Sequence, residues 1–231
     1  GLAAYWRFDE QSGSTAYDFL GGNDATLMEE ASFSSDGHFG GSLLLDGIDD
    51  YAVAYGYKGV SGDMPRTVSA WIKSSEYANS AVVCWGEDYI SGARWQVGIN
   101  DNTWAGNRGA LRVNLHAGKH TASTAVNDGA WRHIAVVLPE KEGSIYSEDL
   151  DFYVDGSLEQ TSLVENVEIS TGNVEDVLIG RFIRPVNYYS GLIDDLRIYE
   201  KELSDEQIAE LNYLENDSEI QYDDACNITY D

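Results

Sequence analysis

Apolar and polar residues alternate along most of this chain in short runs, which are separated by Gly, Asp, Asn and Ser. A period of two is typical of strands that bury one face, and the separating residues favour turns. Asp155-Gly156 predicts a tight hairpin turn, because both central positions of such a turn need positive φ. The spacing predicts an all-β, two-sheet antiparallel sandwich of the jelly-roll type. The runs of strand length are Ala3–Phe8, Ser42–Leu45, Tyr51–Tyr55, Thr67–Lys73, Ala81–Trp85, Arg94–Ile99, Ala110–His116, Trp131–Leu138, Asp151–Val154, Leu158–Ser162, Val177–Ile179 and Leu192–Tyr199.

Helical periodicity occurs only at Asp205–Leu214, directly after the last of these runs. Ser204 can cap the first turn, Gln207 can reach back to it, and Leu203 can pack on Ile208. The sequence therefore predicts one short C-terminal helix that closes a domain spanning residues 1–214. The acidic stretch 215–231 has no clear pattern and is interpreted as a tail or linker.

The composition and net charge of the chain exclude some classes of binding partner. The chain has 231 residues, 43% of them apolar, which is enough to bury a core. Its 14 Lys and Arg face 40 Asp and Glu, giving a net charge of −26. That charge repels nucleic acid and anionic membrane, and no apolar run is long enough to insert into a membrane. It fits a secreted or cell-surface protein in a salty medium, a protein that holds divalent cations, or solubility alone.

The two cysteines, Cys84 and Cys226, lie in an apolar run and in the acidic tail, respectively. A disulfide between them in an oxidising compartment and two unpaired thiols both remain open. The chain begins at Gly1 without a signal peptide, and we interpret it as a mature or excised domain.

Carboxylates gather at two turns and at the start of the last strand. Calcium takes six to eight oxygen ligands from carboxylates, amides, carbonyls and water. Asp18 and Asn23 flank a Gly21-Gly22 turn. The first and last strands of a jelly roll are neighbours, so Asp18 and Asp195 can share one ion. Adjacent side chains on a strand point to opposite faces, so we expect only Asp195, and not Asp194, to face that ion.

A second acidic group surrounds Gly47 and contains Asp46, Asp49 and Asp50. We include Asp46 and Asp50 among the candidate calcium ligands. The alternative for all of these carboxylates is that they accept backbone hydrogen bonds and lock turns.

Tryptophan, tyrosine and polar loop residues suggest a sugar site, since flat sugar faces stack on aromatic rings. Trp6, Trp71 and Trp131 lie in strand patterns and are predicted to be core. Trp104 lies in a polar, glycine-bearing loop with little apolar company. The candidate ligand contacts are Trp104, Asn107, Arg108 and Tyr188.

No residues are assigned to catalysis. His116 and His120 flank a probable turn rather than a helix, Gly-x-Ser-x-Gly is absent, and no strand carries paired glycosidase carboxylates. A polar set alternates along two candidate strands, which leaves a polysaccharide lyase open against the alternative of a solvated sheet face. This set is Arg94, Gln96, Arg112, Asn114 and His116.

Seven segments occur in an order that resembles the laminin G-like, concanavalin A-like jelly-roll domains of secreted multidomain bacterial proteins. They are Ala4–Glu10, Ala16–Leu27, Leu45–Tyr51, Thr67–Lys73, Asn127–Val137, Phe152–Gly156 and Tyr189–Tyr199. The resemblance covers Leu2 to about Leu214. It implies the sandwich fold and a structural calcium ion between the N-terminal loop and the closing strand. Relatives serve as carbohydrate-binding modules, adhesion domains and, more distantly, glycosidases and lyases, so the fold does not choose the function.

We therefore expect a non-catalytic, lectin-like module of a secreted or cell-surface protein, stabilised by Ca²⁺. Its expected partner is a glycan or polysaccharide, together with other domains of the parent protein. The alternatives are an adhesion or spacer domain that contacts proteins and, after it, a lyase or glycosidase.

Overall fold

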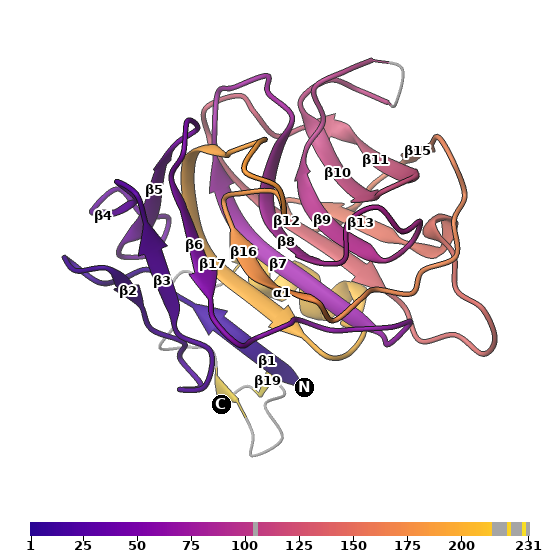
Figure 1. Ribbon diagram of the computed structural model, residues 1–231, viewed down its shortest axis with the longest axis horizontal. Coiled ribbons are helices and arrows are strands. Elements are labelled where there is room, and N and C mark those ends of the chain that lie inside the picture. The colour runs from indigo at the N-terminus through magenta and orange to yellow at the C-terminus, as the bar shows by residue number, and fades with distance from the viewer. Residues whose placement is uncertain (104–105, 214–220, 223–227, 230–231) are drawn as a thin grey trace.

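The computed structural model describes residues 1–103, 106–213, 221–222 and 228–229. Two curved antiparallel sheets pack face to face, and one helix lies against the back of one of them (Figure 1). The predicted all-β jelly-roll sandwich is confirmed. No helix in the described ranges has the length and apolarity needed to cross a bilayer.

The eight-stranded sheet has β17 at its centre, between β7 and β5, and β1 also pairs with β17. The predicted adjacency of the first long strand and the last one is therefore confirmed. The order is β14 (Ser157–Leu158), β13 (Asp151–Val154), β12 (Trp131–Leu138), β7 (Arg66–Lys73), β17 (Ser190–Tyr199), β5 (Ser42–Asp46) and β4 (Ser32–Ser34), with β1 (Leu2–Trp6) beside β17.

The nine-stranded sheet forms the other layer of the sandwich. A further pair, β18 (Gln221–Tyr222) and β19 (Ile228–Thr229), lies near the C-terminus, and a single 3₁₀ turn spans Ser147–Asp149. The nine-stranded order is β15 (Thr161–Leu163), β11 (Gly118–Ala125), β10 (Ala110–Leu115), β9 (Arg94–Ile99), β8 (Ser80–Gly86), β16 (Glu175–Ile179), β6 (Tyr51–Ala54), β3 (Ala25–Met28) and β2 (Thr15–Ala16).

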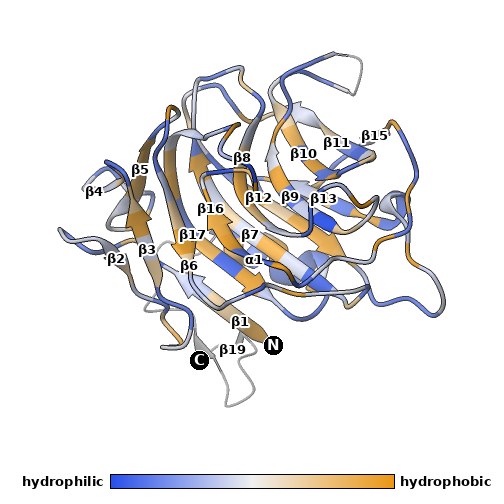
Figure 2. Ribbon diagram, viewed as in Figure 1, coloured by the Kyte–Doolittle hydropathy of each residue, from blue (hydrophilic) through white to orange (hydrophobic). Residues whose placement is uncertain are grey.

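The main core lies between the sheets and is built from alternate residues of their strands. Figure 2 shows the apolar stretches of these strands in orange. Trp6 is fully buried there, as predicted, and Trp85 and Trp95 lie 5.9 Å apart between ring centroids. Trp71 is buried on the outer side of the eight-stranded sheet, under His38, which stacks on it at 3.5 Å. The core prediction is wrong for Trp131, which is half-buried on the outer side of the sheet. The Lys73 ammonium lies 5.9 Å and the His38 ring 6.0 Å from its ring centroid.

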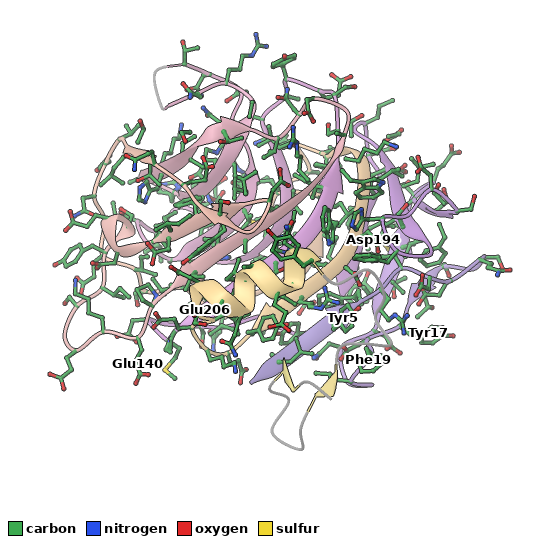
Figure 3. All side chains as sticks on the ribbon, turned by 180° about the vertical axis from the view of Figure 1, so that it is seen from behind. Tyr5, Tyr17, Phe19, Glu140, Asp194 and Glu206 are labelled. Atoms are coloured by element: carbon green, nitrogen blue, oxygen red, sulfur yellow. The ribbon has the colours of Figure 1, made fainter. Side chains whose placement is uncertain are left out.

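The helix α1 (Asp205–Tyr213) packs on the outer side of the eight-stranded sheet, across its back in Figure 3. The predicted capping box is present: the backbone N–H of Gln207 donates to Ser204 Oγ, and that of Ser204 donates to Gln207 Oε1. Leu203 and Ile208 share one buried cluster with Tyr5 and Tyr199, which anchors the helix.

Two predicted segments differ from the structure. The hairpin at Asp155-Gly156 is confirmed, with φ of 50° and 74°, but the single run Leu158–Ser162 is divided between β14 in one sheet and β15 in the other. The probable turn around Gly118 is instead the start of β11, because His116 adopts a φ of 76° and places the turn earlier.

Candidate functional site

The outer face of β9, β10 and β11 is polar, although these strands lie in the middle of a packed sheet. Residues such as Val97 and Val113 point into the core, and the residues that alternate with them point away from it. Arg112 lies opposite Thr121 on β11, and Asn114 lies opposite Gln96 on β9. We call this set the polar face, and all of its members are buried: Arg94, Gln96, Arg112, Asn114 and Thr121.

Arg94 is held by the groups around it. Its Nη1 donates to Asp88 Oδ1 at 2.6 Å, its Nη2 donates to Asn114 Oδ1, and the guanidinium lies 4.6 Å from the ring centroid of Phe182. His116 approaches the same carboxylate, with 3.5 Å between its Nδ1 and Asp88 Oδ1. One end of the polar face is therefore an internally paired network.

Arg112 at the other end is different. Its Nη2 donates to Asn79 Oδ1, and its Nη1 lies 3.6 Å from Asp101 Oδ1. Within the described residues its Nε and Nη1 donate no hydrogen bond, and Gln96 Nε2 and Thr121 Oγ1 are also buried without a partner. Buried polar groups are nearly always hydrogen-bonded, so four such atoms on adjoining strands need an explanation. Three of them are N–H donors.

Burial lowers the pKa of Arg112 to about 10; Asp101 opposes this shift, and the charge of Arg94 adds to it. The guanidinium therefore keeps its charge at neutral pH. A buried cation whose Nε and Nη1 donate no hydrogen bond favours an oxygen-rich or anionic ligand at this position.

Cys84 lies opposite Gln96 on β8 and packs under Phe182. Burial raises the pKa of its thiol to about 12. Cys226 lies outside the described residues, so a disulfide between the two and a pair of free thiols both remain open.

The sequence-predicted ligand residues fall into two places, and Trp104 lies outside the described residues. Asn107 and Arg108 lie in the loop between β9 and β10. Asn107 Nδ2 donates to the carbonyl of Ser123 at the rim of a cavity of about 150 Å³, and Arg108 lies 4.8 Å from the ring centroid of Tyr77. Tyr188 is half-buried, 6.5 Å from the ring of Tyr51. Within the described chain no hydrogen bond or ring contact joins Tyr188 to the other two.

The turn between β5 and β6 brings Asp46, Asp49 and Asp50 together, and we call residues 46–50 the acidic turn. Each offers a carboxylate oxygen within 4.8 Å of the others, and no other group of three potential metal ligands occurs in the described residues. Asp50 accepts hydrogen bonds from the backbone N–H groups of Glu30 and Asp46. Burial, with the charges of Asp46 and Asp49, raises the pKa of Asp50. The carboxylates therefore lock the turn, as the alternative expectation has it, and the calcium ion at this turn stays a prediction.

Asp18 accepts backbone hydrogen bonds, which is the alternative to metal binding that the sequence left open. Its Oδ1 accepts from the N–H groups of Tyr5 and Leu20, and its Oδ2 accepts from those of Gly22 and Asn23. Four donors occupy the lone pairs that an ion would need, so these contacts do not support an ion shared with Asp195. The side-chain amide of Asn23 donates to the carbonyl of Ala3.

Asp194 and Asp195 do not alternate as predicted. A bulge shifts the register of β17 against β7 at this point, and Asp195 has a φ of 51°. Both carboxylates are consequently buried on the outer side of the sheet. Asp194 Oδ2 accepts from the N–H groups of His38 and Phe39, while Asp195 Oδ1 accepts from the Tyr5 hydroxyl. The expectation that only one of them turns inward is wrong.

Sequence reasoning missed Thr121 and the unpaired state of Arg112 and Gln96. The alternation of Thr121 and Ser123 with Ala122 was a usable signal for β11, but its small polar residues resemble a turn. The missing partners depend on β8 to β11 lying side by side, which no local pattern reveals.

Comparisons with known proteins agree with this architecture. The profile of a family described as the concanavalin A-like lectin/glucanases superfamily matches residues 46–209. No curated protein sequence matches the chain.

Solved structures show the same fold at low sequence identity. Domain 4 of AbnA, an extracellular arabinanase of Geobacillus stearothermophilus solved with arabinotriose, is 21% identical, with a TM-score of 0.66, covering 91% of this chain and 98% of that one. Trypanosoma rangeli sialidase is 15% identical, with a TM-score of 0.62, covering 92% of this chain and 32% of the sialidase. The binding domain of Paraclostridial Mosquitocidal Protein 1 is 14% identical, with a TM-score of 0.62, covering 96% of this chain and 54% of that one. The chain thus spans about a third to a half of the last two.

Proposed function

Because this chain belongs to the concanavalin A-like lectin/glucanases superfamily, we propose that it is a non-catalytic carbohydrate-binding module of a secreted or cell-surface protein. The observation that carries the proposal is the set of unpaired donors on the polar face, at Arg112 Nε and Nη1 and Gln96 Nε2. Sugar hydroxyls and carboxylates are acceptors that satisfy such donors. A sugar that carries a carboxylate fits best, because it also neutralises a buried cation.

Asp101 covers Arg112 and is the group that a ligand displaces. Its side chain is 37% exposed, and its oxygen is 3.6 Å from Arg112 Nη1, which is too long for a hydrogen bond. A sugar carboxylate in place of this contact gains a charge-assisted hydrogen bond from Nη1. Asn107 and Arg108 lie at the adjacent rim, and we retain them with Trp104 and Tyr188 as proposed contacts for further sugar residues.

The Arg112→Met variant tests the proposal. We expect its affinity for an oligogalacturonate to fall by about 10- to 100-fold, because a hydrogen bond to a charged group contributes about 1.5–3 kcal/mol. We expect its melting temperature to be unchanged or raised, because a buried cation with unbonded N–H groups costs stability. Calorimetric titration and thermal unfolding of both proteins measure the two effects.

Arg132→Met is the control, since Arg132 lies on β12 in the other sheet and forms surface ion pairs with Asp128 and Asp155. It should leave the affinity unchanged. A lower melting temperature in Arg112→Met with unchanged affinity would assign Arg112 a structural role and reject the site. If no acidic or neutral glycan binds the wild type, the adhesion or spacer alternative takes its place.

A polysaccharide lyase is the second candidate, and one observation favours it. Arg94, Asn114 and His116 come together beside the exposed ring of Tyr89. Eliminating across a uronate needs a cation at the carboxylate, a base for the ring proton and an acid for the leaving oxygen. If the wild type released unsaturated products that absorb ultraviolet light from a uronate polymer, and His116→Ala did not, the protein would be an enzyme.

We further propose that the acidic turn holds Ca²⁺. Three carboxylates converge on it, and Asp49 keeps its carboxylate free of the backbone bonds that lock Asp46 and Asp50. Oxygen-only donors suit calcium. Because β5 and β6 belong to different sheets, an ion at their connection would hold the two layers together.

Chelation with EGTA is expected to lower the melting temperature by about 5–10 °C, because calcium at 100 times its dissociation constant adds about 2.7 kcal/mol. Asp49→Asn should abolish this response, whereas Glu142→Gln, at an exposed acid elsewhere, should retain it. Equal melting curves with calcium and with EGTA would exclude a structural ion.

A further inference from the structure

Two open cavities meet at Asp9 and Glu10, in the segment that follows β1. The larger one is about 550 Å³ and extends towards Phe33 and Ser34, and the smaller one is about 300 Å³ and extends towards Tyr17 and Phe19. Both volumes fall near the range of small-ligand sites. They lie beside β2 and β4, which are terminal strands of the two sheets. The polar face lies towards the other end of the nine-stranded sheet, so the cavities are far from it.

Two aromatic rings form one wall of the smaller cavity. Tyr17 is 62% exposed and Phe19 is 55% exposed, which is unusual for neighbouring large side chains. They flank Asp18, which bridges to Trp6 and is buried, so both rings project to the same side. Figure 3 shows them next to each other at the edge of the molecule, outside Tyr5.

Carboxylate acceptors occupy the floor that the two cavities share. Glu10 Oε1 accepts from the backbone N–H of Tyr17 at 2.8 Å, which fixes the carboxylate beside the ring. Its Oε2 is buried and accepts nothing from the described residues. Asp9 is held by the N–H of Gly41 and by Arg7, at 2.8 Å and 3.1 Å, respectively.

Gly40 keeps the larger cavity in shape. It has a φ of 69°, and a Cβ atom there would lie 2.1 Å from Asp9 Oδ1. Any larger residue would therefore push Asp9 away from its place between the cavities. The site is thus built from locked acceptors and exposed rings.

We propose that these cavities form a second saccharide site, specific for neutral sugars. The rings of Tyr17 and Phe19 stack on the C–H faces of two successive sugar units, and Glu10 Oε2 and Asp9 accept their hydroxyl protons. A carboxylate is an acceptor only, so an acidic sugar is repelled here, also by the charge of −26 on the chain. The polar face offers donors, whereas these cavities offer acceptors beside one cation, Arg7, which is already paired with Asp9. The two sites therefore select opposite classes of sugar.

Amide chemical shifts of the ¹⁵N-labelled full chain test the site, with arabinotriose, cellotriose and maltotriose as separate probes and a trigalacturonate as the acidic probe. At least one neutral probe should shift the amides of residues 9–19 and 33–41. Tyr17→Ala should weaken that probe about tenfold, or about 1.4 kcal/mol. Tyr17→Phe should retain the affinity, because it keeps the ring.

Tyr213→Ala removes an equally exposed ring from the far end of α1 and should leave the affinity unchanged. Arg112→Met should also leave it unchanged, so the failure of one site is distinguishable from failure of the other. The second site is rejected if no neutral probe shifts these amides, if Tyr17→Ala binds as tightly as the wild type while remaining folded, or if the trigalacturonate shifts them as strongly.

Discussion

Replacing Asp18 by alanine is expected to lower the free energy of unfolding by about 3–5 kcal/mol. One carboxylate accepts from four backbone N–H groups, and a donor that loses its acceptor in a buried place costs about 1 kcal/mol or more. The side chain is 4% exposed, so water cannot fully replace it. The loss should lower the melting temperature by about 10 °C in a chain of this size.

Urea unfolding of Asp18→Ala and of Asp24→Ala, each with calcium and with EGTA, measures the effect. Asp24 accepts one backbone hydrogen bond from the described residues, from the N–H of Asp18, so its variant should lose only about 1 kcal/mol. Both variants should retain the calcium response. If Asp18→Ala loses that response and Asp49→Asn keeps it, the ion lies where the sequence first placed it.

Raising the pH from about 5 to about 8.5 is expected to lower the free energy of unfolding by several kcal/mol, through Asp194. Burial, and then the charge of Asp195, raises the pKa of this carboxyl to about 8. The folded chain therefore keeps the proton that the unfolded chain releases near pH 3.9. The stabilisation is complete below the unfolded pKa and is lost as the pH rises through the folded one, at about 1.4 kcal/mol per unit.

Asp194→Asn isolates this contribution, because an amide keeps an oxygen for the N–H groups of His38 and Phe39 and does not titrate. Denaturant unfolding at several pH values should show that the wild type loses its advantage over the variant as the pH rises. His133 makes the free energy of unfolding rise with pH instead, since burial lowers its pKa to about 3. Its contribution is the same in both proteins, because both contain it. Parallel pH profiles for the two proteins would contradict the prediction.

Local sequence patterns were sufficient to predict the strands that have one apolar and one polar face. The bounds of β9, β12 and β13 are those predicted, and the caps of α1 and the turn at Asp155 follow from residues within a few positions of each other. β2 and β4 were missed because they are very short, and β11 because its polar residues do not contrast with its core residues.

The candidate sites were less predictable, because they depend on distant segments. The bulge at Asp194 and Asp195 arises from pairing with β7, about 125 residues earlier by sequence number, and the cover over Asp194 comes from His38 and Phe39. The larger cavity at Asp9 forms only when residues 33–41 lie against the segment after β1. A carboxylate in the sequence therefore does not reveal whether it binds an ion, accepts backbone bonds or holds a proton.

The central place of β17 also governs how the chain can fold. β5 and β7 are synthesised long before the strand that lies between them, so a growing chain carries two unsatisfied strand edges until residue 199 has left the ribosome. Pairings of such long sequence separation close slowly. Unpaired strand edges of this kind favour edge-to-edge association during synthesis.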